Sequence, residues 1–104
     1  MTETRFNHLP LCDRPMPAAE VIKDMYMEDM SGAQLATAID VSASTVSRML
    51  NGKSALTPEL AIKICAHIGG SPAVLMRIET EYRLAIAQLE TDTSKIKPRE
   101  LVTA

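Results

Sequence analysis

Hydrophobic residues recur three and four positions apart along most of the chain, which is the spacing of one face of an α-helix. The pattern predicts helices over about 17–30, 31–40, 42–50, 57–68 and 71–90, opened by Pro or by a capping Ser or Thr. We therefore expect an all-α domain at 17–90 with a short C-terminal tail at 91–104. Residues 1–16 have two prolines and no helical or strand period, which predicts a flexible N-terminal arm.

The second predicted helix, 31–40, carries clear signals at both ends. Ser31 is a good N-cap, and Gln34 stands three positions later, where its side chain can reach back to the Ser31 amide. Asp40 ends the helix, because Asp tolerates the left-handed backbone that a tight turn requires. Val41 then fills the corner before the next helix. The inward positions are Leu35, Ala36 and Ile39.

The third predicted helix has small polar residues on its outer face, as a helix that enters the major groove of DNA would have. Either Ser42 or Ser44 caps it, and Val46, Met49 and Leu50 face inward. Thr45 suits contact with a thymine methyl, and Arg48 suits guanine or phosphate, although an isolated surface Arg is often only solvated. The candidate DNA-binding residues are Ser31, Ser42, Ala43, Ser44, Thr45, Ser47, Arg48, Asn51 and Lys53.

The formal charge of −2 is unusual for a DNA-binding protein, so the distribution of charge matters. Residues 41–54 contain Arg48 and Lys53 and no acid, whereas acids are concentrated between 20 and 29. This separation leaves a basic side for DNA and an acidic side for a basic partner. Aromatic residues make up only 3% of the chain, which argues against stacking platforms for single-stranded RNA.

The cysteines and histidines give no strong sign of a metal or catalytic site. Cys12 and Cys65 lie far apart in a chain without a signal peptide, so we expect a reduced, cytoplasmic protein without a disulfide. His8 and Cys12 have a ligand-like spacing that Pro10 interrupts, and Cys65 and His67 point to different faces of a helix. We expect no metal, no cofactor, no membrane segment and no enzymatic activity, because no phosphate loop or nucleophile–base pair is present.

The last predicted helix is too long for the core of so small a domain. At about 1.5 Å per residue it spans nearly 30 Å, and part of its apolar stripe should contact a second subunit. The candidate dimer residues are Leu75, Ile78, Tyr82, Ile86 and Leu89. The tail after it is basic and contains Pro98, and Ile96 with Leu101 and Val102 could form a short strand.

Three consecutive segments carry a family resemblance. The recognition-helix run STVSRMLNGK, the following ALTPELAIKI and then SPAVLMRIETEY resemble the HigA-type antitoxins of the phage-repressor (XRE) helix-turn-helix superfamily. The likeness covers about 17–96 and implies a five-helix, phage-repressor-like domain. It also implies a homodimer that binds operator DNA, represses its own operon and neutralises a small basic, RelE-like toxin that cleaves messenger RNA.

The chain departs from the family pattern at three places. Gly32 stands where a phosphate-contacting Gln is common, Asp40 replaces the usual turn Gly, and Leu75-Met76 replaces Trp-Leu. The first change weakens one DNA contact, the second adds a negative charge near the DNA backbone, and the third alters packing rather than function.

The toxin-binding surface implied by the resemblance has two candidates. The first is the acidic group Glu20, Asp24, Glu28 and Asp29, and the second is the apolar arm around Phe6, Leu9 and Leu11. Two other functions remain open at this point. The chain could be a phage-type repressor without a toxin, or a helix-turn-helix module that binds only proteins.

Overall fold

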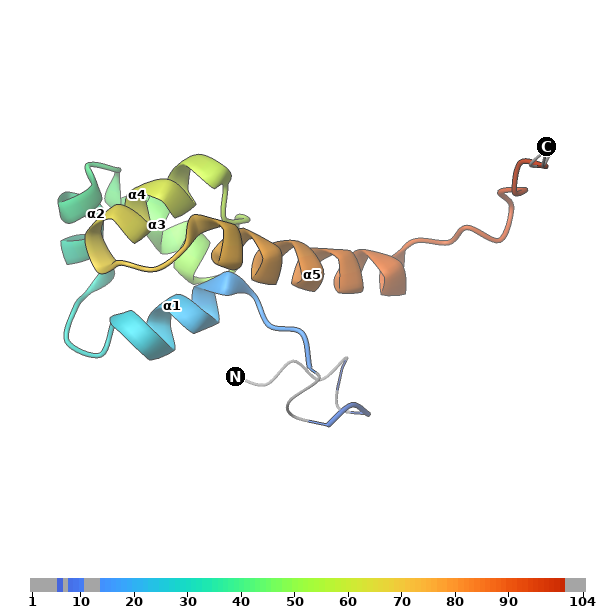
Figure 1. Cartoon of the computed structure of the whole chain (residues 1–104), viewed down its shortest axis with the longest axis horizontal. Helices are drawn as coiled ribbons and strands as arrows, with labels where there is room; N and C mark the ends of the chain where they lie inside the picture. The colour runs from blue at the N-terminus through green and yellow to red at the C-terminus, as the bar shows by residue number, and fades with distance from the viewer. Residues whose placement is uncertain (1–5, 7, 11–13, 101–104) are drawn as a thin grey trace.

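The structure is a computed structural model of the 104-residue chain, and it describes residues 6, 8–10 and 14–100. The described chain contains five α-helices and no strand, which confirms the all-α prediction. The helices are α1 Ala18–Tyr26, α2 Gly32–Ile39, α3 Ala43–Leu50, α4 Pro58–Ile68 and α5 Pro72–Glu90. Helices α1 to α4 gather around the first half of α5, and its second half projects away with the tail (Figure 1). No described helix has both the length and the apolar character to cross a membrane.

The hydrophobic core is aliphatic and lies where the first four helices meet α5. Its largest fully buried side chains come from all four of the early helices: Ile22, Leu35, Val46, Met49 and Ile64. Helix α5 adds Leu75 to the same cluster, and Val41 packs against it from the turn between α2 and α3. The inward faces predicted for α2 and α3 are confirmed.

Helix α1 is shorter than the sequence pattern predicts. Pro17 is its N-cap with extended backbone (ψ 150°), not its first helical residue, and the helix ends at Tyr26 instead of Met30. The apolar spacing continues past the helix because Met27 and Met30 pack against the core from the following loop. Apolar periodicity therefore continues beyond the last residue of the helix.

The described part of the N-terminal arm contains one buried side chain. Phe6 is only 4% exposed, and its carbonyl accepts a hydrogen bond from the Leu9 amide at 3.0 Å. Arg14 Nε donates to the Leu9 carbonyl at 2.9 Å. Leu11 and Cys12 lie outside the described residues, so the arm is described only in part.

The tail from 91 to 100 is fully exposed and contains no strand, so the strand suggested for Ile96 is wrong within the described chain. Instead, the Asp92 carboxylate accepts a hydrogen bond from the Ser94 amide at 2.9 Å, and the Ile96 amide donates to Thr93 O at 3.0 Å. The bond from Ser94 lowers the pKa of Asp92. A lone strand has no neighbouring strand to pair with, and Leu101 and Val102 lie outside the described residues.

Candidate nucleic-acid interface

The turn between α2 and α3 is built by the residues that the sequence analysis selected. Ser31 Oγ accepts from the Gln34 amide at 3.1 Å, and Gln34 Oε1 accepts from the Ser31 amide at 2.8 Å, a complete capping box. Asp40 is left-handed (φ 56°, ψ 51°), and the Val41 amide bonds the Ala36 carbonyl at 3.0 Å. The predicted cap and turn are both confirmed.

Helix α3 is capped by Ser42, which settles the choice between Ser42 and Ser44. Ser42 Oγ accepts from the Thr45 amide at 3.2 Å and lies 2.7 Å from the Thr45 hydroxyl. Thr45 is half-buried and hydrogen-bonded to the Ser42 side chain, whereas Ser44 is exposed. At the start of α2, a Cβ on Gly32 would lie 3.4 Å from Leu50 Cδ1, an ordinary van der Waals distance, so the packing of α2 against α3 does not require glycine here.

The outer face of α3 is exposed, polar and without acids. Asn51 Nδ2 donates to Ser47 Oγ at 3.3 Å, which orders two of the candidate contacts. The Arg48 carbonyl accepts from the Lys53 amide at 2.9 Å and the Ser54 amide at 3.3 Å, so the loop after α3 folds back beside the helix. The exposed candidates are Ser31, Ser42, Ala43, Ser44, Ser47, Arg48, Asn51 and Lys53. Of these, Ala43, Ser47 and Asn51 line a hollow beside the end of α1, and Arg48 lines a cavity on the α4 side of the helix with Thr45.

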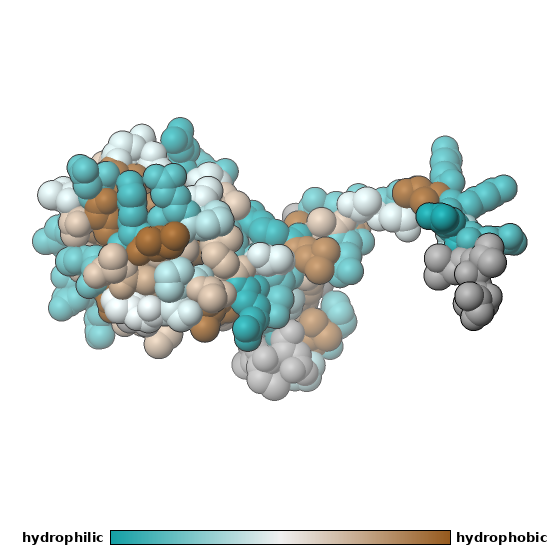
Figure 2. Space-filling view, turned by 45° about the horizontal axis from the view of Figure 1, so that its top comes forward, coloured by the Kyte–Doolittle hydropathy of each residue, from teal (hydrophilic) through white to brown (hydrophobic). Residues whose placement is uncertain are grey.

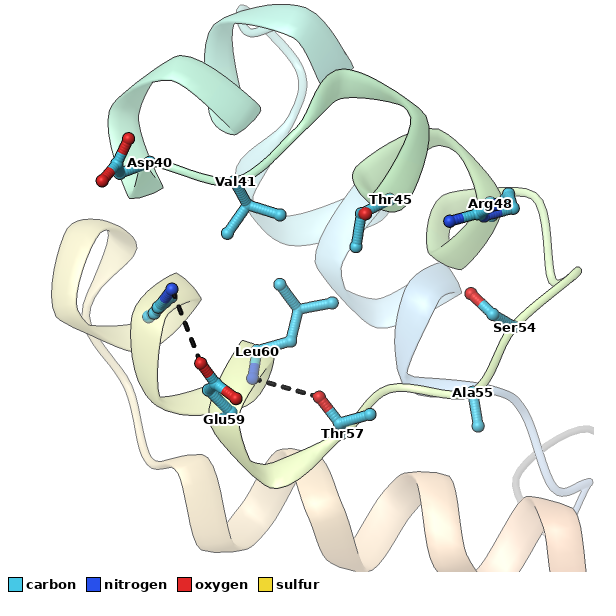
Figure 3. A pocket seen from close by; sticks show the side chains of 10 residues that line it. Asp40, Val41, Thr45, Arg48, Ser54, Ala55, Thr57, Glu59 and Leu60 are labelled. Atoms are coloured by element: carbon cyan, nitrogen blue, oxygen red, sulfur yellow. Dashed lines mark hydrogen bonds and ion pairs between the residues drawn. The ribbon is translucent and has the colours of Figure 1, made fainter.

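A cavity of about 500 Å³ lies between α3 and α4 and flanks this face (Figure 3). Thr45 and Arg48 line it from α3, and Ser54, Thr57 and Lys63 line it from the loop and α4. Two acids, Asp40 and Glu59, stand at the same cavity, and Lys63 Nζ lies 3.7 Å from Glu59 Oε1. Sequence reasoning did not single out Ser54 and Lys63, although the position of Ser54 in the loop after the recognition helix, next to Lys53, was a usable signal.

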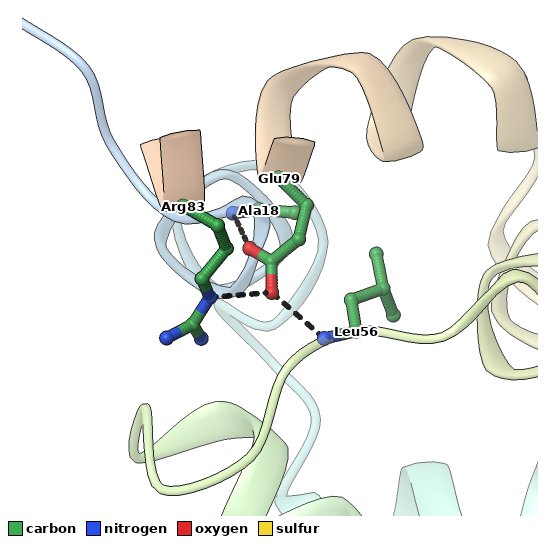
Figure 4. A network of polar contacts seen from close by, with 4 residues as sticks. All are labelled: Ala18, Leu56, Glu79 and Arg83. Carbon is green, nitrogen blue, oxygen red and sulfur yellow. Dashed lines mark hydrogen bonds and ion pairs between the residues drawn. The ribbon is translucent and has the colours of Figure 1, made fainter. Parts of the chain in front are cut away.

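A buried carboxylate holds the loop that follows α3, and the sequence analysis did not single it out. Glu79 on α5 is 4% exposed. Its Oε2 accepts from the Leu56 amide at 2.7 Å and from Arg83 Nε at 3.3 Å, and its Oε1 accepts from the Ala18 amide at 3.1 Å (Figure 4). The side chain thus ties α5 to the start of α1 and to the α3–α4 loop. An acid four positions after Leu75 in an apolar stripe was the available signal.

The predicted dimer residues divide into two groups along α5. Leu75 is 6% exposed and belongs to the core of the single chain, so it offers little surface to the predicted subunit interface. Ile78 is half-buried against the same core. Tyr82 and Ile86 are half-buried and Leu89 is 56% exposed, so the free apolar surface lies on the outer half of α5.

The acidic candidates are spread along α1 and the loop after it, with Glu20 in the first turn of the helix. Glu20 is half-buried and its carboxylate lies 3.1 Å from Lys23 Nζ, which neutralises part of its charge. Asp24 is exposed on the helix, and Glu28 and Asp29 are exposed in the loop after it, because α1 ends earlier than predicted. The uncompensated negative charge is therefore carried by Asp24, Glu28 and Asp29.

The described residues contain no group of three or more potential metal ligands. Cys65 is buried and His67 is exposed, so the two point to different surroundings. Burial raises the pKa of the Cys65 thiol, which makes it a poor nucleophile and a poor ligand at neutral pH. His8 is exposed, and Cys12 lies outside the described residues.

Comparison with known proteins agrees with this geometry. The helix-turn-helix family matches residues 26–75. An uncharacterised HTH-type transcriptional regulator, YddM of Escherichia coli, is 35% identical over 95 residues, which cover 91% of this chain and 99% of that protein.

Two solved structures from Pseudomonas aeruginosa share the fold. The antitoxin HigA with the higBA promoter is 30% identical, with a TM-score of 0.71 over 79% of this chain and 89% of that one. PA4674 in complex with its operator DNA is 28% identical, with a TM-score of 0.72 over 83% of this chain and 98% of that one. The chain therefore belongs to the helix-turn-helix proteins of the phage-repressor (XRE) superfamily, among the HigA-type antitoxins.

Proposed function

We propose that this protein is a dimeric repressor that binds the operator of its own operon and neutralises a small basic toxin. The observation that carries the DNA part is the exposed, acid-free face of α3, ordered by the Ser42 cap and the Asn51–Ser47 hydrogen bond. Small side chains at Ala43 and Ser44 let the helix approach base edges closely. The structures of the HigA antitoxin and PA4674 with DNA support the same role for this chain.

Arg48 and Lys53 have different roles in DNA binding. Arg48 extends from the last turn of α3 beside the α3–α4 cavity, where a guanidinium reaches a guanine edge. Lys53 lies in the exposed loop after the helix, where an ammonium suits a phosphate. One contact gives sequence specificity, and the other gives affinity that depends on salt.

Fluorescence anisotropy with the duplex upstream of the protein's own gene tests these roles. Arg48→Ala should weaken operator binding by about 1–3 kcal/mol and relax specificity at one base pair per half-site. Lys53→Ala should weaken all duplexes alike and reduce the salt slope by about one. Arg77→Ala, at an exposed base on α5, is the control. Wild-type binding by both interface variants would refute the assignment.

Dimerisation follows from the outer half of α5, where Tyr82, Ile86 and Leu89 leave an apolar stripe partly uncovered. A two-fold axis there would place two recognition helices on successive major grooves, about 34 Å apart. Ile86→Asp should give a folded monomer with much weaker operator binding. Sedimentation that shows an unchanged dimer would remove this helix from the interface.

The toxin part of the proposal rests on Asp24, Glu28 and Asp29. A nuclease that grips RNA must be cationic, and complementary charge raises the association rate and favours the correct partner. We expect a small basic protein to be encoded beside this gene, and the test uses that protein. Asp24→Lys with Glu28→Lys should lower its association rate at low salt and leave operator binding intact.

The matched control for the toxin experiment is Asp92→Lys with Glu100→Lys, which changes the charge equally on the exposed tail. If both pairs leave the association rate unchanged, the N-terminal arm around Phe6 and Leu9 becomes the better candidate. A similar fall with both pairs would indicate only a long-range charge effect.

A further inference from the structure

An apolar pocket of about 260 Å³ lies where α1, the end of α4 and the start of α5 meet. Its walls are almost entirely apolar: Val21 and Met25 of α1, Cys65 of α4, and Val74, Leu75 and Ile78 of α5. At its rim Met25 is 66% exposed and Val74 is 49% exposed. The proposed DNA-binding function does not use this surface.

The charges beside the pocket are mostly negative. Exposed Asp24 precedes Met25, and exposed Glu81 lies one helical turn after Ile78 on α5, with Arg77 as the exposed base on the same stretch. Glu28 and Asp29 follow in the loop after α1. The surface therefore suits an apolar anchor flanked by basic side chains.

The tail of this chain has an apolar side chain flanked by basic ones. Residues 93–99 contain Lys95, Lys97 and Arg99 and no acid, and Ile96 stands between the two lysines and is 70% exposed. Figure 2 shows hydrophobic and hydrophilic side chains together on the tail, well separated from the body of the molecule. An Ile left this exposed gains by burial in an apolar pocket.

The tail reaches at most the near wall of the pocket in its own chain. From Glu90 to Ile96 is six residues, which span at most about 21 Å when extended. Along α5, Ile78 lies about 18 Å back from Glu90 and Val74 about 24 Å back. In the structure the tail instead continues outward from the end of α5, away from the pocket (Figure 1). The far wall of the pocket is therefore within reach only on a second molecule.

We propose that Ile96, with Lys95 and Lys97, docks into the α1–α4–α5 pocket of the partner subunit in the dimer. The inference rests on the proposed dimer. If the outer halves of α5 pack antiparallel and cross near Ile86, the partner subunit's Val74 lies about 18 Å beyond the crossing point. Ile96 can extend up to about 27 Å beyond it, so the anchor reaches the pocket with slack.

Disulfide trapping tests the exchange directly. In a Cys12→Ser background, Val74→Cys combined with Ile96→Cys should form a covalently linked dimer under mild oxidation. Ile62→Cys combined with Ile96→Cys is the control, because Ile62 is equally exposed (59%) but lies on α4 outside the pocket. Separately, Ile96→Asp should weaken the dimer about tenfold or more, and Thr93→Asp in the same tail should weaken it less.

The outcomes separate the tail exchange from the proposed dimer. If the unmodified protein sediments as a monomer, both ideas fail. If it sediments as a dimer but the Val74–Ile96 pair does not link and Ile96→Asp does not weaken association, only the tail exchange is overturned. If instead the toxin protects Val74→Cys from alkylation while the tail never links, the pocket is a toxin site and the proposal is wrong.

Discussion

The cluster of α2, α3 and α4 and the outer half of α5 have similar apolar spacing but different surroundings. Each helix of the cluster buries at least three side chains, whereas the buried residues of α5, Leu75 and Glu79, both lie in its first half. Further along, Leu84 and Leu89 are 55% and 56% exposed. Helical periodicity therefore identifies an apolar face, but only the path of the chain decides what covers that face. In the cluster the chain folds back on itself, and in α5 it extends past the core.

The largest expected effect comes from the centre of the cluster. Ile64 is fully buried on α4, so Ile64→Ala should lower the free energy of unfolding by about 2–5 kcal/mol. Ile62→Ala, two residues away on the exposed side of the helix, should change it by less than about 0.5 kcal/mol. Urea unfolding followed by circular dichroism measures both. Similar losses for the two variants would contradict the burial that separates them.

The junction between the two regions is the next place to test. Glu79→Ala leaves the buried amides of Ala18 and Leu56 without their acceptor, so it should cost about 2–4 kcal/mol. Glu81→Ala on the exposed side of α5 is the control and should be nearly neutral. Glu79→Gln keeps one acceptor oxygen, so its free energy of unfolding in the same urea titration should lie between those of Glu79→Ala and Glu81→Ala. Equal stability for all three variants would mean that Glu79 does not join the regions.

A smaller effect is expected where α3 begins. Ser42→Ala removes the acceptor for the Thr45 amide and should destabilise the protein by about 1 kcal/mol. Ser44→Ala, in the first turn of the same helix, removes no cap and should be close to neutral. Thermal unfolding of both variants gives the comparison. A larger loss from Ser44→Ala would return the capping role to Ser44.

The smallest effect concerns the left-handed corner at Asp40. Glycine adopts φ 56° without strain, so Asp40→Gly should stabilise the protein by about 0.5 kcal/mol after the entropy cost of glycine. Removal of a negative charge beside the α3–α4 cavity should also tighten operator binding at low salt. Calorimetry and anisotropy measure the two effects. Destabilisation by glycine would show that the Asp40 side chain stabilises the protein by more than its left-handed backbone conformation costs.

The helix-turn-helix could be predicted because its signals are local. Ser31, Gln34 and Asp40 act through backbone groups within four residues of themselves, so their roles can be predicted from the local sequence. The exposure of the α3 face was also predictable, since Val46, Met49 and Leu50 fix which side turns inward. The bases that each side chain contacts stay predictions, because they depend on the DNA.

The remaining features depend on segments that are distant in sequence. Whether Leu75 faces the core or a second subunit depends on where α5 leaves the domain. The spacing of apolar residues gives no information about that point. The cavity that joins Arg48 to Lys63 forms only when α4 packs beside α3. Met27 and Met30 continue the spacing of α1 although that helix has ended, because the loop also packs against the core.

The carboxylate of Glu79 also has a consequence for how the chain folds. Its partners Ala18 and Leu56 lie 61 and 23 residues away in sequence, whereas the contacts between α2 and α3 are nearly local. Contacts that close long loops carry a high entropic cost, so this junction should form after the transition state for folding. Substitution of Glu79 should therefore accelerate unfolding and leave the refolding rate nearly unchanged, which makes this side chain a determinant of the lifetime of the native state.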